Sequence, residues 1–250
     1  MRLEPRSLLV GLAIAGMAGA VLFLPAISFI GTMLLPNPPV PATQRVSPLL
    51  ADAIWARTNG GRATELQPLN PFTIGRAASC HILAERFERS ERSAQHDECM
   101  KLLPGLQAVG YLSTVHSKSE GVWQDPRVPF VGLATMTRIT DKWTKAELLN
   151  TLAERGEFGV GLIGAEAASR GYFSRSADQL TLPQAAMIGA FTGDNRIDPW
   201  CDPEEAAVRR HRILVKMREN QAIDEAAFGA ADKSELGLSP LPANHQPCKG

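Results

Sequence analysis

The most conspicuous pattern in the chain is a long apolar stretch near its amino terminus. Residues 7–44 contain no Asp, Glu, Lys, Arg or His, and residues 8–35 are built mostly from Leu, Val, Ala, Ile, Gly, Met and Phe. About 20 consecutive apolar residues cross a bilayer as a helix, so we expect a transmembrane helix at residues 7–35. The apolar run continues past the small residues at 18–20, which favours an uncleaved anchor over a signal peptide.

The sequences that flank this stretch indicate an orientation. Arg2 and Arg6 precede it, and positive residues favour the cytoplasmic side, so residues 1–6 are expected to be a cytoplasmic tail. Residues 36–44 contain four prolines and are expected to form a stiff linker. The remainder of the chain would then lie on the far side of the membrane, in a single-pass arrangement.

Beyond the linker, the spacing of apolar residues is typical of helices, and runs of alternating β-branched residues are scarce. Capping boxes, which begin helices, are formed by Thr144 with Glu147 and by Thr181 with Gln184. Asp202, followed by Pro and two acidic residues, is a third helix start. We therefore predict a mainly α domain at residues 45–236, followed by a coil tail at residues 237–250.

The third predicted helix carries several basic residues. Arg209, Arg210 and Arg212 are expected to face solvent or a ligand, while its apolar residues face the core. Gly159, Gly161 and Gly164 predict a turn ahead of another helix, where the glycines permit close approach of either a ligand or a neighbouring helix.

Composition and charge narrow the classes of function. Apolar residues make up 44% of the 250, which suits one globular domain rather than a disordered chain. Lys plus Arg and Asp plus Glu number 26 each, so no global charge field attracts nucleic acid. We expect no nucleic-acid partner.

Four cysteines in an exported domain can form two disulfides with three connectivities. We favour Cys80 with Cys99 and Cys201 with Cys248. The set Cys80, His81, His96 and Cys99 contains zinc-type ligands, but adjacent residues 80 and 81 cannot readily aim both side chains at one metal. We therefore expect no metal site.

The segment FGVGLIGAEAASRGYF at residues 158–173 resembles the late motif of the family 51 glycosyltransferases, the peptidoglycan transglycosylases. The resemblance continues through residues 180–186, 197–199, 202–207 and 209–210, and includes the helix start at residues 144–149. It implies a mainly α, lysozyme-like transglycosylase domain that acts on lipid II to make glycan strands. It also implies a bacterial inner-membrane location with a periplasmic main domain.

Upstream, the resemblance assigns roles to further residues. The family has E-D-R-R-F where this chain has residues 59–63, so Asn59 stands at the position of the general-base Glu. An amide cannot accept a proton near neutral pH, and losing a general base costs about 10²- to 10⁴-fold in rate. The resemblance places Arg62 and Arg155 at phosphate-binding positions, and Ser113 and Thr114 in a second motif, so these four are the predicted substrate-binding residues.

Each of these positions also has a purely structural interpretation. Asn59 with the two following glycines is typical of a turn, and Ser113 and Thr114 are more often turn or capping residues. Isolated arginines such as Arg62 and Arg155 are common on surfaces.

Three functional hypotheses follow. The first is a membrane-anchored protein of cell-wall synthesis that binds lipid II or nascent glycan but is catalytically impaired, a pseudoenzyme. The second is a non-catalytic envelope scaffold or regulator that contacts other proteins and membrane lipid. The third is an active transferase whose carboxylate comes from elsewhere, with Mg²⁺ expected as a cofactor only in that case. The candidate carboxylates are Glu65, Glu85, Glu88 and Glu120.

Overall fold

The computed structural model describes residues 26, 29–34, 37–70, 72–74, 76, 79–80, 99, 103–122, 124–159, 161–194, 196, 198–242, 245 and 248. These residues are mainly helical, as predicted. The helices with defined bounds are α2 (Pro48–Arg57), α5 (Leu106–Ser119), α6 (Val128–Lys142), α7 (Lys145–Arg155), α8 (Ala165–Phe173), the 3₁₀ turn η1 (Ala177–Gln179), α9 (Leu182–Ala190), α10 (Pro203–Glu219) and α11 (Glu225–Asp232).

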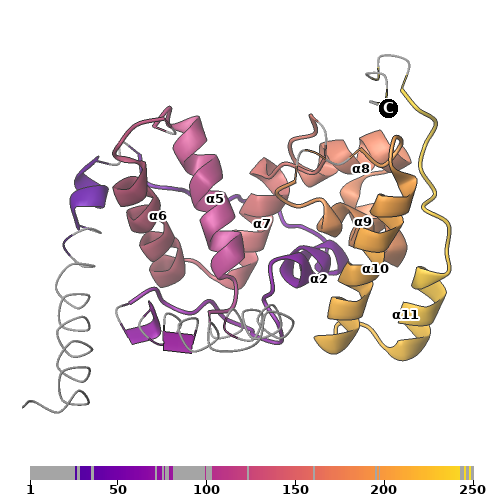
Figure 1. Cartoon of the computed structure of the whole chain (residues 1–250), viewed down its shortest axis with the longest axis horizontal. Helices are drawn as coiled ribbons and strands as arrows, with labels where there is room; N and C mark the ends of the chain where they lie inside the picture. The colour runs from indigo at the N-terminus through magenta and orange to yellow at the C-terminus, as the bar shows by residue number, and fades with distance from the viewer. Residues whose placement is uncertain are drawn as a thin grey trace, which may run out of the picture.

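The helices form two groups that meet at α2 (Figure 1). On one side α5 packs against α6 and α7; on the other, α8, α10 and α11 surround α9. Residues 185–190 of α9 are all buried, and α2 lies directly against them. Gly189 makes this approach possible, because a Cβ at that position would fall 2.7 Å from the Cβ of Ala53.

The predicted helix starts are confirmed. Thr144 and Glu147 cap each other at the start of α7, and the side chain of Gln184 accepts a hydrogen bond from the Thr181 N–H at 3.1 Å. The carboxylate of Asp202 accepts from the Glu205 N–H at 3.2 Å at the start of α10. These local bonds satisfy backbone donors that a helix leaves unpaired at its first turn.

Two interpretations of residue environments were wrong. Ser113 and Thr114 do not lie in a turn; they are in the middle of α5, where the surrounding apolar residues pack against α6 and α7. Arg210 does not face solvent or a ligand. It is 5% exposed, and its guanidinium donates to the carbonyl oxygens of Asp232, Ser234 and Glu235, so it ties α10 to the segment after α11.

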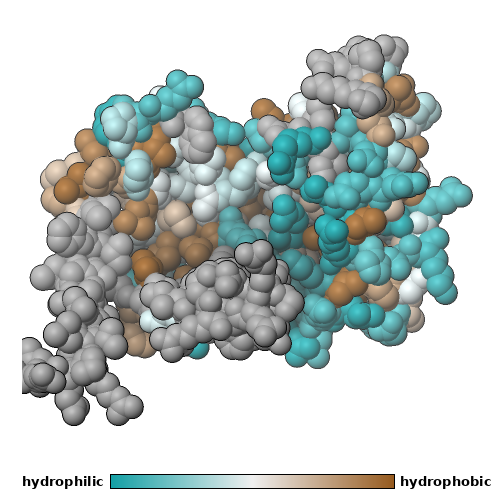
Figure 2. All heavy atoms as spheres, in the orientation of Figure 1, coloured by the Kyte–Doolittle hydropathy of each residue, from teal (hydrophilic) through white to brown (hydrophobic). Residues whose placement is uncertain are grey.

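The expected transmembrane helix falls mostly on residues outside those that the structure describes. Within the described part of the chain, no helix has the length and apolarity needed to cross a membrane. The surface shows two regions of different character, with the larger apolar areas over the α5 and α6 side and mainly hydrophilic side chains over α8 to α11 (Figure 2).

Candidate functional site: a basic pocket beside Asn59

Asn59 lies in a tight turn that ends α2. The hydroxyl of Thr58 donates to the carbonyl oxygens of Ile54 and Trp55 and closes the last turn of the helix. Asn59 then adopts a positive φ of 54°, a conformation that Asn tolerates better than most residues. The turn predicted here from the sequence is therefore present, and it aims the Asn59 side chain at α10.

The amide of Asn59 is held by a cation. Lys216, on α10, donates a hydrogen bond from Nζ to Oδ1 of Asn59. Between Asp52 and Glu65 the sequence contains no carboxylate, so a shift of one or two positions in the family alignment would not supply one either. The position expected to carry a general base is occupied by a neutral acceptor bound to lysine.

Lys216 also lines a pocket of about 730 Å³ between α2, the end of α9 and α10. The pocket is strongly basic. Its acidic lining residues are Asp194 and Glu219, and its permanently charged cations are more numerous. These cations are Arg57, Arg196, Arg209, Arg212 and Lys216.

Asp194 is the structural centre of this charge cluster. Its side chain is 6% exposed and pairs with Arg209 at 2.9 Å and with Arg196 at 3.3 Å. Burial alone would raise the pKa of Asp194, but the hydrogen bonds from Arg196 and Arg209 outweigh burial and lower the pKa to about 2. The carboxylate is thus held ionised and is too weakly basic to take a proton from a sugar hydroxyl.

Arg57 is the cation of the pocket that comes from α2. Its Nε donates to the carbonyl oxygen of Ala190 at 3.2 Å, at the end of α9. Burial and the nearby charge of Arg209 lower the pKa of the Arg57 guanidinium. An arginine starts from so high a value that it remains charged. Arg57 therefore brings a poorly solvated positive charge, which favours an anionic ligand.

The four predicted substrate-binding residues have hydrogen-bond partners in different parts of the chain. Arg62 lies near Asn59, but its Nε and Nη2 donate to the Glu219 carbonyl oxygen at 3.1 and 3.0 Å. Arg155 donates to the carbonyl oxygen of Val40 at 3.0 Å and pairs with Glu154. A ligand role for these arginines stays a prediction.

Ser113 and Thr114 lie on α5, whose residues are not among those that line the basic pocket. The Ser113 hydroxyl donates to the carbonyl oxygen of Gly132 at 3.0 Å and joins α5 to α6. The Thr114 hydroxyl donates to the carbonyl oxygen of Gly110 within the helix. Their predicted contact with substrate also remains a prediction.

Two of the four carboxylates proposed for an active transferase lie among the described residues. Glu65 is exposed. Glu120 accepts a hydrogen bond from the side chain of Asn37 at 3.0 Å. Glu85 and Glu88 lie outside the described residues.

Several residues of the basic pocket were missed from sequence, notably Arg57, Asp194 and Lys216. A signal was available in α10, because Arg209, Arg212 and Lys216 follow the i, i+3, i+7 spacing of one helix face. Nothing in the local sequence indicated that this face would lie against the turn at Asn59.

The turn itself depends on Gly60. A Cβ at this position would fall 1.9 Å from Cε2 of Trp55, inside the indole. The ring is 2% exposed, and its Nε1 donates to the Gly61 carbonyl oxygen at 3.0 Å, so it cannot swing away freely. The Asp that the family has at this position would not fit the present arrangement.

We expect Gly60→Ala to lower the free energy of unfolding by about 1–3 kcal/mol, the usual range for overpacking. Urea unfolding followed by circular dichroism measures it. Gly229→Ala in α11 is the matched control, because a Cβ there meets no atom within 4 Å, and it should be neutral or slightly stabilising. Equal stability of the Gly60 variant and the wild type would show that the turn does not rest on the Trp55 ring.

Two disulfides join the cysteines. Cys80 is bonded to Cys99 and Cys201 to Cys248, which is the connectivity favoured from the sequence. The first bridge holds a segment of which few residues are described, whereas the second attaches the C-terminal tail to the start of α10.

Comparison with known proteins matches part of the chain to one family. The Transglycosylase family model matches residues 131–218, which span α6 to α10 and most of the basic pocket. Penicillin-binding protein 1B of Escherichia coli (strain K12) is 27% identical over 194 residues, 77% of this chain and 21% of the relative. Penicillin-binding protein 1A of Mycobacterium tuberculosis is 33% identical over 92 residues, 36% of this chain and 11% of the relative.

A shorter relative gives the same assignment. The biosynthetic peptidoglycan transglycosylase of Haemophilus influenzae (strain ATCC 51907 / DSM 11121 / KW20 / Rd) is 33% identical over 107 residues, 42% of each chain. This chain thus spans less than half the length of these relatives. The helical architecture, the matched segment and these relatives together show that the chain contains a transglycosylase-like domain of glycosyltransferase family 51.

Proposed function

We propose that this protein binds lipid II or nascent glycan in peptidoglycan synthesis and polymerises it weakly or not at all. The observation that carries the proposal is a basic pocket bordered by Lys216, whose amine is hydrogen-bonded to an amide at the position of the general base. The pocket supplies charge for the pyrophosphate of lipid II, whereas position 59 supplies no base. The anchor expected at residues 7–35 would keep the pocket close to its lipid-linked ligand.

The chemistry of the pocket suits a pyrophosphate. Guanidinium groups bind phosphate oxygens through paired hydrogen bonds, and lysine adds a compact charge. Arg212 is exposed on the same helix face as Arg209 and Lys216, and Arg209 already pairs with Asp194 and Glu205. Arg212 and Lys216 both border the pocket from α10, so we expect each of them to contribute to the binding of an anionic ligand.

The test is the affinity for fluorescent lipid II of the full-length protein in detergent. Arg212→Ala and Lys216→Ala should each weaken binding by about tenfold or more, because a hydrogen bond to a charged group contributes about 1.5–3 kcal/mol. Arg218→Ala is the matched control from the same helix. Arg218 instead contacts the Phe228 ring and Glu225 on α11, so affinity should be unchanged.

Salt dependence gives a second readout in the same assay. Affinity of the wild type should fall as salt rises, since the interaction is largely electrostatic, and the two pocket variants should show a shallower fall. If none of the four proteins binds lipid II, or if all four bind it equally well, the pocket is not the lipid II site. That result would favour a scaffold that acts through protein contacts.

A further inference from the structure

The C-terminal tail returns to the loop between α9 and α10 and brings together a second group of reactive side chains. The members of this tail cluster are Asp198, Cys201, His245 and Cys248. The cluster is separate from the basic pocket, and none of its members lines that pocket. Its possible chemistry does not depend on the function proposed above.

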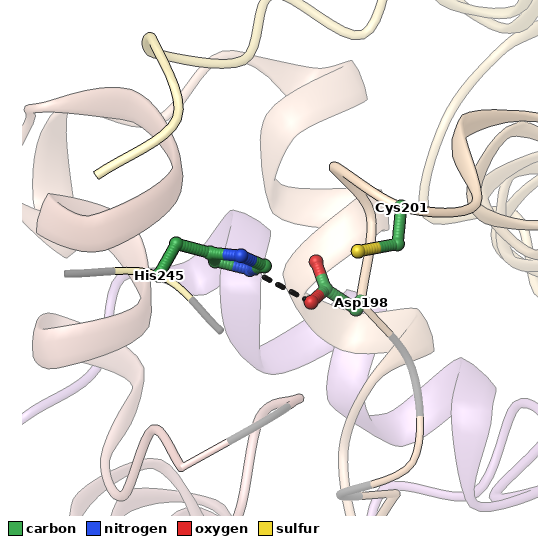
Figure 3. A group of neighbouring side chains, drawn as sticks. All are labelled: Asp198, Cys201 and His245. Atoms are coloured by element: carbon green, nitrogen blue, oxygen red, sulfur yellow. Dashed lines mark ion pairs between the residues drawn. The ribbon is translucent and has the colours of Figure 1, made fainter. Parts of the chain in front are cut away.

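Three of the four side chains point toward one space (Figure 3). A ligand atom from each of Asp198, Cys201 and His245 lies within 4.8 Å of the other two. Nε2 of His245 is 2.8 Å from Oδ2 of Asp198, and Cys248 is bonded directly to Cys201. All four potential ligands therefore come from one small region that joins the tail to the domain.

The carboxylate and the imidazole are both positioned by neighbours. Oδ1 of Asp198 accepts a hydrogen bond from the Trp200 N–H at 3.1 Å, which leaves Oδ2 to face His245. The ring of Trp200 packs edge-on against the imidazole, with centroids 5.3 Å apart, and Trp200 Nε1 donates to the Ser239 carbonyl oxygen. Such supporting contacts orient metal ligands in known sites.

One polar atom of the cluster is unsatisfied. Nδ1 of His245 is buried and has no hydrogen-bond partner within the described part of the chain. Buried polar atoms are nearly always paired, and an exception often marks a place for an ion or a functional change of state. The imidazole thus presents Nε2 to Asp198 and leaves Nδ1 without a partner among the described residues.

We propose that reduction of the Cys201–Cys248 bond converts the tail cluster into a zinc site. In the oxidised protein both sulfurs form the disulfide, so neither is available as a thiolate ligand for a metal. Two thiolates, an imidazole and a carboxylate form a ligand set of the kind that zinc takes in tetrahedral sites. The sequence led us to expect no metal, and the proposal departs from that expectation for the reduced protein.

Reduction of the disulfide supplies the two cysteine ligands. A thioredoxin-like dithiol gives two electrons and two protons to the Cys201–Cys248 disulfide, which becomes two thiols while the donor becomes a disulfide. Zinc then displaces the two thiol protons, which pass to water, and coordinates the thiolates.

The movement required of the Asp198 and His245 ligand atoms is small. With bonds of about 2.1 Å to nitrogen and oxygen and about 2.3 Å to sulfur, tetrahedral ligands lie roughly 3.3–3.8 Å apart. The Asp198 and His245 atoms, now 2.8 Å apart, would separate by about half an ångström. The 4.8 Å limit covers the distances among Asp198, Cys201 and His245, whereas the sulfur of Cys248 would have to separate from that of Cys201 and turn toward the other three ligands.

The test measures zinc binding by the full-length protein in competition with a chromophoric chelator. Cys80→Ser with Cys99→Ser removes the other disulfide, so that only the tail cluster supplies thiols. After reduction, this protein should bind one zinc ion per chain, and before reduction it should bind none at the same concentrations. His245→Ala in the same background should weaken binding at least tenfold.

A second measurement uses the wild type and avoids any variant that fails to fold. Reduced protein is alkylated with iodoacetamide with and without zinc, and the modified cysteines are mapped by mass spectrometry. Zinc should protect Cys201 and Cys248. Equal alkylation of both residues with and without zinc, or zinc uptake that is unchanged in Cys201→Ser with Cys248→Ser, would overturn the proposal.

Discussion

Replacing Asp194 by Ala is expected to lower the free energy of unfolding by about 1–3 kcal/mol, the cost typical of leaving hydrogen-bond donors without their partner. Asp194 is 6% exposed and faces Arg196 and Arg209. Without the Asp194 carboxylate, the positive charges of Arg57 and Arg209 repel each other, because Asp194 interacts favourably with both. Urea unfolding monitored by circular dichroism gives the difference directly.

An acid titration of stability separates the charge of Asp194 from its packing. The folded-state pKa of about 2 lies below the ordinary value of 3.8, so the stabilisation is present above pH 4 and is lost as the pH falls toward 2. The wild type should therefore lose stability in this window, and the Asp194→Ala variant should lose less. Asp141→Ala, at an exposed acid on α6, is the control and should shift stability by no more than about 0.5 kcal/mol.

If Asp194→Ala unfolds at the same urea concentration as the wild type, the arginine cluster is not held by this carboxylate. In that case the basic pocket would be a solvated surface rather than a preorganised site. Such a result would also weaken the proposed binding function, because the positions of Arg57 and Arg209 would no longer be fixed.

Lipid II polymerisation by the wild-type protein is expected to be about 10²- to 10⁴-fold slower than that of an active family member, the usual cost of losing a general base. Asn59→Glu should recover at least about tenfold of this loss, since the pocket cations remain in place. Lys216, which now binds Asn59, would then face the new carboxylate. Gel analysis of glycan products from labelled lipid II, with Mg²⁺ present, measures the rate.

Asn59→Gln is the matched control, because it has the length of Glu without the charge, and it should stay as slow as the wild type. The family Asp at position 60 is left out of the restored protein, since Gly60 faces the Trp55 ring. Glycan made by the wild type at the rate of the active control would show that a carboxylate elsewhere serves as the base. If Asn59→Glu polymerises lipid II no faster than the wild type, the loss of activity arises from the pocket as a whole and not from position 59 alone.

Much of the helical framework could be predicted from local sequence. The starts of α7, α9 and α10 follow from capping residues that lie within four positions of each helix, so the information is contained in short segments. The turn at Asn59 is of the same kind, because Asn and Gly accept positive φ whatever surrounds them. The resemblance of residues 158–173 to the family motif was equally readable, and the family match bears it out.

The errors have a common physical origin. Ser113 and Thr114 are residue types that favour turns, but the apolar residues around them, such as Val109 and Leu112, are buried against neighbouring helices, and packing outweighs a weak local preference. Arg210 was expected to face outward because charge usually does. Its burial is compensated by carbonyl oxygens at the end of α11 and just after it, more than 20 residues away in sequence.

Three properties can be read from neighbouring residues alone: where helices begin, that the chain resembles a transglycosylase, and that position 59 lacks a carboxylate. The packing of distant segments is needed to bring Lys216 to Asn59, to place Asp194 beside Arg57 of α2 and Arg209 of α10, and to return His245 to Asp198. These contacts join residues 15 to 157 positions apart. Their energies come from burial and charge in three dimensions, which local propensity does not encode.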